Sequence, residues 1–413
     1  NEELVHLFEI VQVPSATEEQ TQQVLAIMTE AIERRSGIEI PYTTLRSLVR
    51  TTSGVLQNTP YPERAFDVLE ESLVVAQSAG SKVLAEKVIA QVVSRKVGVP
   101  VGKVLQTERD YLLNLEEVMH RRIVNQHRAV SAIARAMIRA RAGVRDTKKP
   151  IGTFLFLGPT GVGKTETAKT LAQTYFGSED YLSRLDMSEY QGERGVESLL
   201  GSAAQPVGRL ASIMSEQPFT VLLLDEFEKA HPMVHQLFLQ ILDEGRITDA
   251  RGQQVSFNHA IIIATSNAGA ELIRTTVHTQ EQLPDGFEDT LREHILQEGI
   301  MRSELLNRFD GVITFTPLSK QHIEQIARLM LKALNRRLDT QHGVQVTITD
   351  ELVTYLASIG YDPEFGARPM SRALKNTVEY AVARMVLKGE LVPGKPVTLT
   401  PEQLHELAQP ESA

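Results

Sequence analysis

Residues 153–172 read TFLFLGPTGVGKTETAKTLA, an apolar run that passes through a glycine-rich loop into a stretch with helical spacing. The loop fits the pattern Gly-x-x-x-x-Gly-Lys-Ser/Thr, and a position between a strand and a helix is the context in which this pattern binds phosphate. Glycines let backbone N–H groups close around phosphate oxygens, and the helix N-terminus favours the same negative charge. We therefore expect an α/β fold with a phosphate-binding loop, with a nucleotide bound by Gly158, Pro159, Thr160, Gly161, Val162, Gly163, Lys164, Thr165 and Glu166.

Two further apolar runs end in polar residues. VLLLDE ends in Asp225 and Glu226, and AIIIATSN ends in Asn267. Because these runs alternate with helical stretches, they predict a parallel sheet covered by helices, with its ligand site at the carboxyl ends of the strands. Alone, the acidic pair would be surface charge and the asparagine a turn residue. Beside a phosphate loop they predict a hydrolytic site, in which Asp225 and Thr165 hold Mg²⁺, Lys164 reaches the terminal phosphates, Glu226 orients the attacking water and Asn267 holds that water.

A chain of 413 residues exceeds what one hydrophobic core usually organises, so several domains are expected. Helical patterns without a catalytic constellation fill the first block, the strands described above fill the second, and the third carries helices with strand-like runs at 344–348 and 397–399. Ser319 stands where the third block should cap its first helix. The predicted domains are residues 1–104, 105–316 and 317–413.

The composition excludes several kinds of chemistry. The chain has no cysteine, which excludes disulfides, thiolate metal sites and a cysteine nucleophile. Its net charge of -9 disfavours nucleic acid as a partner. No apolar run reaches the roughly 20 residues that cross a bilayer, and no leader opens the chain. We expect a cytoplasmic protein that does not bind membranes.

Other candidate features have simpler interpretations. The arginine-rich stretch from Arg121 to Lys149 has an apolar face, which is typical of a surface helix or a subunit contact. His231 and His235 have the spacing of a zinc pair, but the segment lacks the accompanying glutamate and a third ligand, so we interpret them as helix surface residues. No Gly-x-Ser-x-Gly elbow supports a serine protease.

Seven segments point to a known family, namely GPTGVGKTETAKTLA, RLDMSEY, LLLDEFEKAHP, ILDEGRITDARGQQVSF, TSNAG, ELLNRFD and FGARPMSRAL. Together they resemble the second ATPase module of Clp-type double-ring AAA+ unfoldases and disaggregases, the family of ClpA, ClpB and ClpC, which implies an α/β fold of the P-loop NTPase class. The first 104 residues resemble the small helical domain that closes the first module, so the chain is expected to be a fragment that begins inside that module. A long coiled-coil insertion of the ClpB kind is missing, which makes ClpA and ClpC the closer comparisons.

The resemblance implies further site residues. Arg308 in NRFD matches the arginine finger that reaches the γ-phosphate of a neighbouring subunit, and Arg368 in GAR matches the sensor arginine of the small domain. Ile123 and Val124 match the pair that lines the adenine pocket. The implied cofactors are ATP and Mg²⁺, and the implied assembly is a homo-oligomeric ring of six subunits.

The resemblance also implies a motor that remodels or threads polypeptides through a central channel. The channel loop of the family carries an aromatic residue, where this chain has Pro206 in GSAAQPVGRLAS, residues 201–212. Either the loop is altered, or the sequence is closed over a flexible segment. The tripeptide that docks a ClpP-like peptidase has no clear counterpart, DGFED being the nearest, so a peptidase partner is not expected. The alternative function is a nucleotide-dependent assembly module or a nucleic-acid remodeller that threads no polypeptide.

Overall fold

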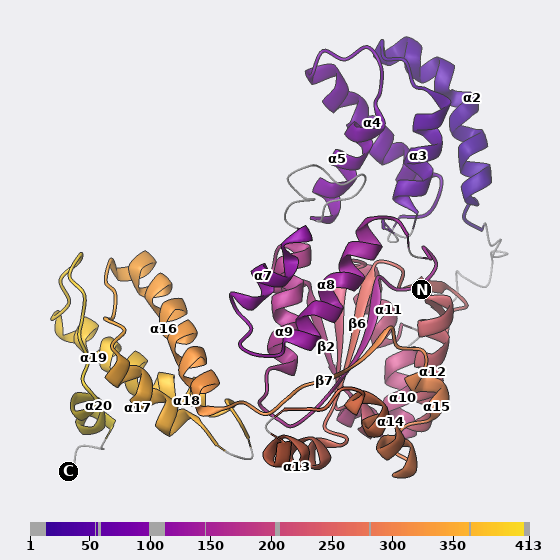
Figure 1. Cartoon of the computed structure of the whole chain (residues 1–413). Coiled ribbons are helices and arrows are strands. Elements are labelled where there is room, and N and C mark those ends of the chain that lie inside the picture. Colours follow the sequence, from indigo (N-terminus) through magenta and orange to yellow (C-terminus); the bar gives the residue numbers. More distant parts are fainter. Residues whose placement is uncertain are drawn as a thin grey trace, which may run out of the picture.

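The structure is a computed structural model (Figure 1) that describes residues 14–53, 55–56, 59–98, 112–144, 146–202, 207–280, 282–362 and 365–408. Along the chain it holds a helical N-terminal part, an α/β part built on a parallel sheet, and a helical C-terminal part. This arrangement confirms the predicted fold class. The boundary predicted between residues 104 and 105 lies outside the described residues, as does Pro206.

The α/β part is built on a five-stranded parallel sheet with the strand order β2-β3-β6-β1-β7. Successive side chains point to opposite faces, so Phe154 and Phe156 enter one core cluster while Leu155 and Leu157 enter the other. The strands are β1 (Gly152–Leu157), β2 (Leu182–Asp186), β3 (Thr220–Asp225), β6 (Ala260–Ser266) and β7 (Gly311–Thr314), and a separate antiparallel hairpin holds β4 (Arg246–Thr248) and β5 (Gln254–Ser256).

Helices cover both faces of the sheet, which explains why its central strands are almost continuously apolar. One face packs against α7 (Leu115–His120), α8 (His127–Arg141) and α9 (Lys164–Leu171). The other face packs against α10 (Glu193–Leu200), α11 (Arg209–Glu216), α12 (Pro232–Glu244), α13 (Ala270–Gln280), α14 (Phe287–Gln297) and α15 (Ser303–Leu306). None of the described helices is both long and apolar enough to cross a membrane.

The N-terminal part is a group of helices joined to the α/β part. Thr17 and Gln20 form a capping box at the start of its first helix, and Gly37 ends that helix in the left-handed conformation. The Tyr181 hydroxyl donates a hydrogen bond to the Val97 carbonyl at 3.3 Å, across the junction of the two parts. The helices are α2 (Glu18–Ser36), α3 (Tyr42–Thr52), α4 (Glu63–Ser78) and α5 (Glu86–Val97).

The C-terminal part has a hydrophobic core of its own. The Ser319 hydroxyl accepts a hydrogen bond from the His322 N–H, so the predicted helix cap is confirmed. The two strand-like runs do not form strands, because they meet only in an isolated bridge between Val346 and Val397. The helices are α16 (Lys320–His342), α17 (Asp350–Gly360), α18 (Met370–Leu374), α19 (Tyr380–Lys388) and α20 (Pro401–Ala408).

The C-terminal part touches the glycine-rich loop through the turn that precedes α18. The Ala367 N–H donates a hydrogen bond to the Gly161 carbonyl at 3.1 Å. Gly161 has a φ of 76°, and a Cβ built on it would lie 1.8 Å from the carbonyl oxygen of Phe365. Only glycine satisfies both the backbone conformation and this close approach. The contact therefore couples the glycine-rich loop to the C-terminal part.

We expect Gly161→Ala to push this turn away from the loop. The Ala367 amide should then exchange its hydrogen at least about 5-fold faster, which corresponds to the loss of a typical hydrogen bond of about 1 kcal/mol. Hydrogen exchange followed by mass spectrometry measures this rate. Gly177→Ala is the matched control, because Gly177 also has a positive φ, of 94°, but its Cβ would meet nothing within 4 Å. Equal exchange rates in the two variants would contradict the contact.

Candidate active site

The glycine-rich loop connects β1 to α9 at the carboxyl edge of the sheet. Its three glycines Gly158, Gly161 and Gly163 all have positive φ, at 150°, 76° and 102°. This backbone carries the chain from the strand directly into the helix, whose first residue is Lys164. Thr165 is partly exposed in the first turn of the helix and Glu166 is exposed beside it. The loop therefore has the form that the sequence predicted for phosphate binding.

Lys164 is only 9% exposed, and its ammonium group points back into the loop. Its Nζ donates hydrogen bonds to the carbonyl oxygens of Gly158 and Pro159, the latter at 3.1 Å. A third bond runs to Asn267 Oδ1 at 2.9 Å. Burial lowers the pKa of Lys164 to about 8, although the charges of Glu228, Asp225 and Glu226 oppose this effect. The site thus holds a buried cation with neutral hydrogen-bond partners and carboxylates at a greater distance.

Asp225 and Glu226 lie where β3 ends, as predicted. Asp225 accepts a hydrogen bond from the Thr265 hydroxyl, and Arg184 on β2 forms an ion pair with its other oxygen at 2.7 Å. Glu226 adopts the left-handed conformation with a φ of 56°, which turns the chain away from the strand. Lys229 donates to Glu226 Oε2 at 2.7 Å, and this hydrogen bond raises the pKa of Lys229.

Asn267 lies between the loop and the acidic pair, because β6 is the neighbour of both β1 and β3. Its Oδ1 accepts from Lys164 and also from the Thr160 hydroxyl at 3.5 Å. Its backbone N–H donates to Glu228 Oε1 at 3.1 Å. Glu228 was not among the predicted site residues, because a glutamate three residues after Asp225 in LLLDEFEKAHP carries no signal of its own in the sequence.

Ile123 and Val124 directly precede a turn that is hydrogen-bonded to the glycine-rich loop. Ile123 is buried and Val124 is partly exposed. The chain then turns sharply at two residues with positive φ, Asn125 and Gln126. The Gln126 side chain donates to the Val162 carbonyl at 3.2 Å and to the Thr316 carbonyl at 2.9 Å, which joins this turn to the loop and to the segment that leads into the C-terminal part.

The two predicted arginines occupy different places. Arg368 is exposed in the turn that contacts Gly161, so it is close to the loop. Arg308 precedes β7 and forms an ion pair with Asp243 at 2.9 Å. Two residues further on, the Asp310 N–H donates to the Thr153 carbonyl near the start of β1. Because a strand rises about 3.3 Å per residue, the length of β1 separates Arg308 from the loop by roughly 20 Å.

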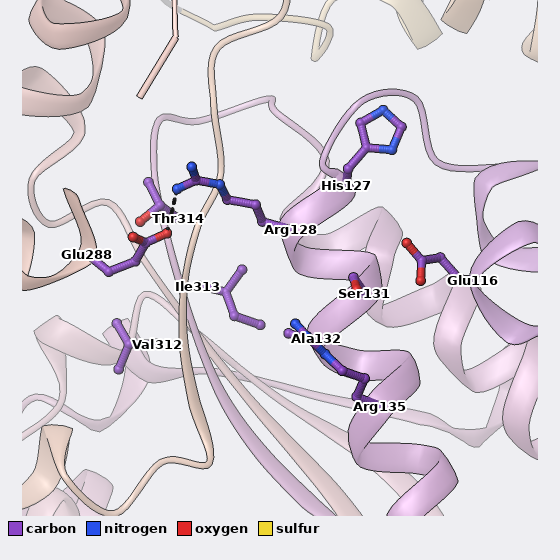
Figure 2. A pocket seen from close by; sticks show the side chains of 10 residues that line it. All are labelled: Glu116, His127, Arg128, Ser131, Ala132, Arg135, Glu288, Val312, Ile313 and Thr314. Atoms are coloured by element: carbon purple, nitrogen blue, oxygen red, sulfur yellow. Dashed lines mark hydrogen bonds and ion pairs between the residues drawn. The ribbon is translucent and has the colours of Figure 1, made fainter. Parts of the chain in front are cut away.

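The cavity in Figure 2 is separate from these residues. It opens between the arginine-rich helix α8, the edge strand β7 and the start of α14, and it contains no predicted site residue. Arg128 is held there by Glu288 at 2.9 Å and Asp285 at 3.6 Å. The apolar face of α8 packs into the core while Arg135 and Arg139 are exposed, as the surface-helix interpretation predicts.

The structure also shows where the histidine pair and the DGFED segment lie. His231 caps α12, whereas His235 is partly buried and donates from Nε2 to the Phe227 carbonyl at 2.9 Å, so its interpretation as a surface residue was wrong. Burial lowers the pKa of His235. No three His, Asp or Glu side chains among the described residues form a metal-binding group. Phe287 of DGFED is buried at the start of α14, so it does not project as a docking tripeptide would.

Comparisons with known proteins match this geometry. Residues 149–312 match the AAA domain of the Cdc48 subfamily, and residues 318–399 match the C-terminal D2-small domain of ClpB. Two solved structures of Hsp104 are similar to this chain. The closed state with ATPγS and FITC-casein superposes on it with a TM-score of 0.78 at 31% identity, over 95% of this chain and 69% of the other. The Saccharomyces cerevisiae Hsp104–ADP complex has a TM-score of 0.76 at 30% identity and covers 97% of this chain and 70% of the other.

Sequence relatives agree. The chain is 37% identical to the chaperone protein ClpB of Vibrio vulnificus over 96% of its own length, but it spans only 46% of that relative. It is 40% identical to the ATP-binding subunit ClpC of the Clp protease of Staphylococcus epidermidis. That match covers 82% of this chain and 42% of the relative. It is 42% identical to the probable chaperone protein ClpB 1 of Chlorobaculum tepidum and covers 80% of its own length and 78% of the relative. From the loop, the sheet, the C-terminal part and these relatives together, the chain belongs to the Clp family of AAA+ proteins.

Proposed function

We propose that this chain hydrolyses ATP at the carboxyl edge of its sheet. One observation carries the proposal. The buried Lys164, beside a glycine-rich helix N-terminus, donates a hydrogen bond to Asn267 and is stabilised by the charges of Asp225 and Glu226. Lys164 would bind the terminal phosphates, Glu226 would orient the attacking water, and Asn267 would hold that water. The phosphate-binding residues would be those of the loop from Gly158 to Glu166, and Ile123 and Val124 would line the adenine pocket.

The residues present fit a magnesium ion. Asp225 supplies a carboxylate that is 17% exposed, and Thr165 supplies a hydroxyl in the first turn of α9. Mg²⁺ usually takes one or two carboxylates and completes its coordination with water and substrate phosphates, so this small ligand set suits it. When bound, the ion would neutralise charge on the phosphate oxygens. Asp225 is also the residue that would give up its ion pair with Arg184 to hold it.

We further infer that the active form is a ring. Arg308 lies at the sheet edge opposite the loop, so it cannot stabilise the phosphates bound by its own subunit, whereas a neighbouring subunit could bring its loop to Arg308. Arg368 would act within the subunit, through the turn that touches Gly161. We propose that the ring has six subunits. We also propose that each chain consists of three domains, at residues 1–104, 105–316 and 317–413.

The substrate class would be polypeptide, and the proposed activity is remodelling or threading of protein chains. The relatives carry the name of chaperones, and one of the similar Hsp104 structures was solved with casein. For this chain the net charge of -9 and the ion-paired Arg128 disfavour nucleic acid. A cytoplasmic location and the absence of a peptidase partner are proposed with it.

Lys164 should react with an amine-acylating reagent at a lower pH than ordinary lysines do. Because burial lowers its pKa to about 8, labelling of the nucleotide-free chain should rise with a midpoint near pH 8, whereas an ordinary lysine titrates near 10.4. Mass spectrometry of the peptide that contains Lys164, at a series of pH values, gives the midpoint. Saturating ATP should suppress this labelling while exposed lysines of the same digest remain labelled. A midpoint above about pH 10 would contradict the burial.

A subunit-mixing experiment tests the ring. Arg308→Ala should lower ATP turnover by about 10³-fold or more, the usual effect of losing an arginine finger, and Glu226→Gln should abolish turnover. Mixing these two inactive variants should restore part of the activity, because some interfaces then join an intact site to an intact finger. Mixing Glu226→Gln with Lys164→Ala is the matched control and should restore nothing, since neither variant has an intact site. Failure of the first mixture to recover would contradict the action of Arg308 across an interface.

A further inference from the structure

We propose that Glu228 is a positioning residue for hydrolysis: it fixes the backbone of Asn267 and, through Asn267, the direction in which Lys164 and the attacking water are held. The proposal rests on the ATPase function proposed above. Asn267 Oδ1 is the side-chain atom that reaches Lys164, at 2.9 Å, and Glu228 Oε1 accepts the N–H of the same asparagine, at 3.1 Å. Glu228 is therefore one residue away from the atoms that would contact ATP.

The turn that carries Glu228 is firmly anchored. Residues Phe227–Lys229 form one 3₁₀ turn directly after Glu226. Phe227 is fully buried and packs edge-on against Phe238 and Phe309. Its carbonyl accepts the hydrogen bond from His235, which fixes the turn from the side of α12. Glu228 thus projects toward the end of β6 from a rigid base.

The carboxylate of Glu228 differs from the two others in the site. Asp225 has an ion pair with Arg184, and Glu226 has one with Lys229. Glu228 has no direct ion pair within the part of the chain that the structure describes, and its buried Oε2 has no hydrogen-bond partner there. A buried carboxylate oxygen without a hydrogen-bond partner destabilises the fold, so the presence of Glu228 at this position calls for a reason. The charge of Lys164 compensates it through space, and Glu228 is the strongest of the three charges that favour the protonated lysine.

Removal of the Glu228 side chain would release the Asn267 N–H. The segment after β6 would then lose one of its anchors, and Oδ1 would lose its position opposite Lys164. The water that Asn267 and Glu226 share would be held less well. ATP would still bind, because the loop backbone and its glycines do not depend on this bond.

The test compares Glu228→Ala, Glu228→Gln, Asn267→Ala and the double variant Glu228→Ala/Asn267→Ala in steady-state ATP turnover. Glu228→Ala should lower kcat by about 10-fold or more, the effect expected for a lost hydrogen bond to a charged group. KM for ATP should stay within about 3-fold. Glu228→Gln should keep most of the activity, because its amide oxygen can still accept the Asn267 N–H. Glu298→Ala, which removes an exposed carboxylate of the same α/β part, is the control and should change nothing.

The double variant decides whether Glu228 acts through Asn267. If it does, Glu228→Ala should lower kcat no further once Asn267 is already alanine. Additive losses in the double variant would overturn the proposal, as would equal losses in Glu228→Gln and Glu228→Ala. A general loss of folding would instead appear as a lower melting temperature and a weaker binding of a fluorescent ATP analogue in both Glu228 variants, and it would also overturn the proposal.

Hydrogen exchange separates this proposal from the ATPase proposal. The Asn267 amide should exchange faster in Glu228→Ala but not in Glu228→Gln, whether or not the chain turns over ATP. An unchanged exchange rate in Glu228→Ala overturns the positioning role. If the wild-type chain has no ATPase activity that Glu226→Gln removes, the ATPase proposal fails by a measurement that does not involve Glu228.

Discussion

The rest of the site depends on the burial of the Lys164 ammonium group and on the hydrogen bonds that stabilise it there. Moving a charged amine from water to a position that is 9% exposed is costly, and burial lowers its pKa to about 8. The protein offsets this cost with two loop carbonyls and the Asn267 amide oxygen, while Glu228, Asp225 and Glu226 add their charge from further away. A terminal phosphate would supply the direct negative partner that these neutral oxygens replace. The loop is thus arranged around a positive charge that suits a phosphate ligand.

Much of this arrangement could be predicted from the sequence, because it follows from local patterns. The apolar runs that end in Asp225, Glu226 and Asn267 are strands whose carboxyl ends meet at one edge, as the alternation of strands and helices required. The strand predicted at 344–348 does not form, and the reason lies in a residue outside that segment. The side-chain amide of Asn335, on α16, exchanges two hydrogen bonds with the backbone of Val346, at 2.8 Å each, and so takes the place of a neighbouring strand.

Glu228 and His235 escaped the sequence reasoning for a related reason. Each has an ordinary helical or turn position in the sequence, and its role comes from a partner that only the fold supplies. His235 bonds to the carbonyl of Phe227, eight residues earlier, and Glu228 bonds to the backbone of Asn267, which directly follows β6. Residue types and spacing predict groups that would contact a ligand directly. They do not identify the groups that hold those residues in place, because many turns contain a glutamate.

Two features relate the glycine-rich loop to distant parts of the structure. Arg308 lies at the sheet edge opposite the loop, where it forms an ion pair with Asp243. In the proposed ring, its charge would act on the site of a neighbouring subunit. The turn around Ala367 presses on Gly161, so a change in the C-terminal part is felt by the glycine-rich loop through one backbone hydrogen bond. A nucleotide that alters the loop must therefore also bias the C-terminal part, by the reciprocity of linked equilibria. The same loop thus connects the predicted nucleotide site to the C-terminal part.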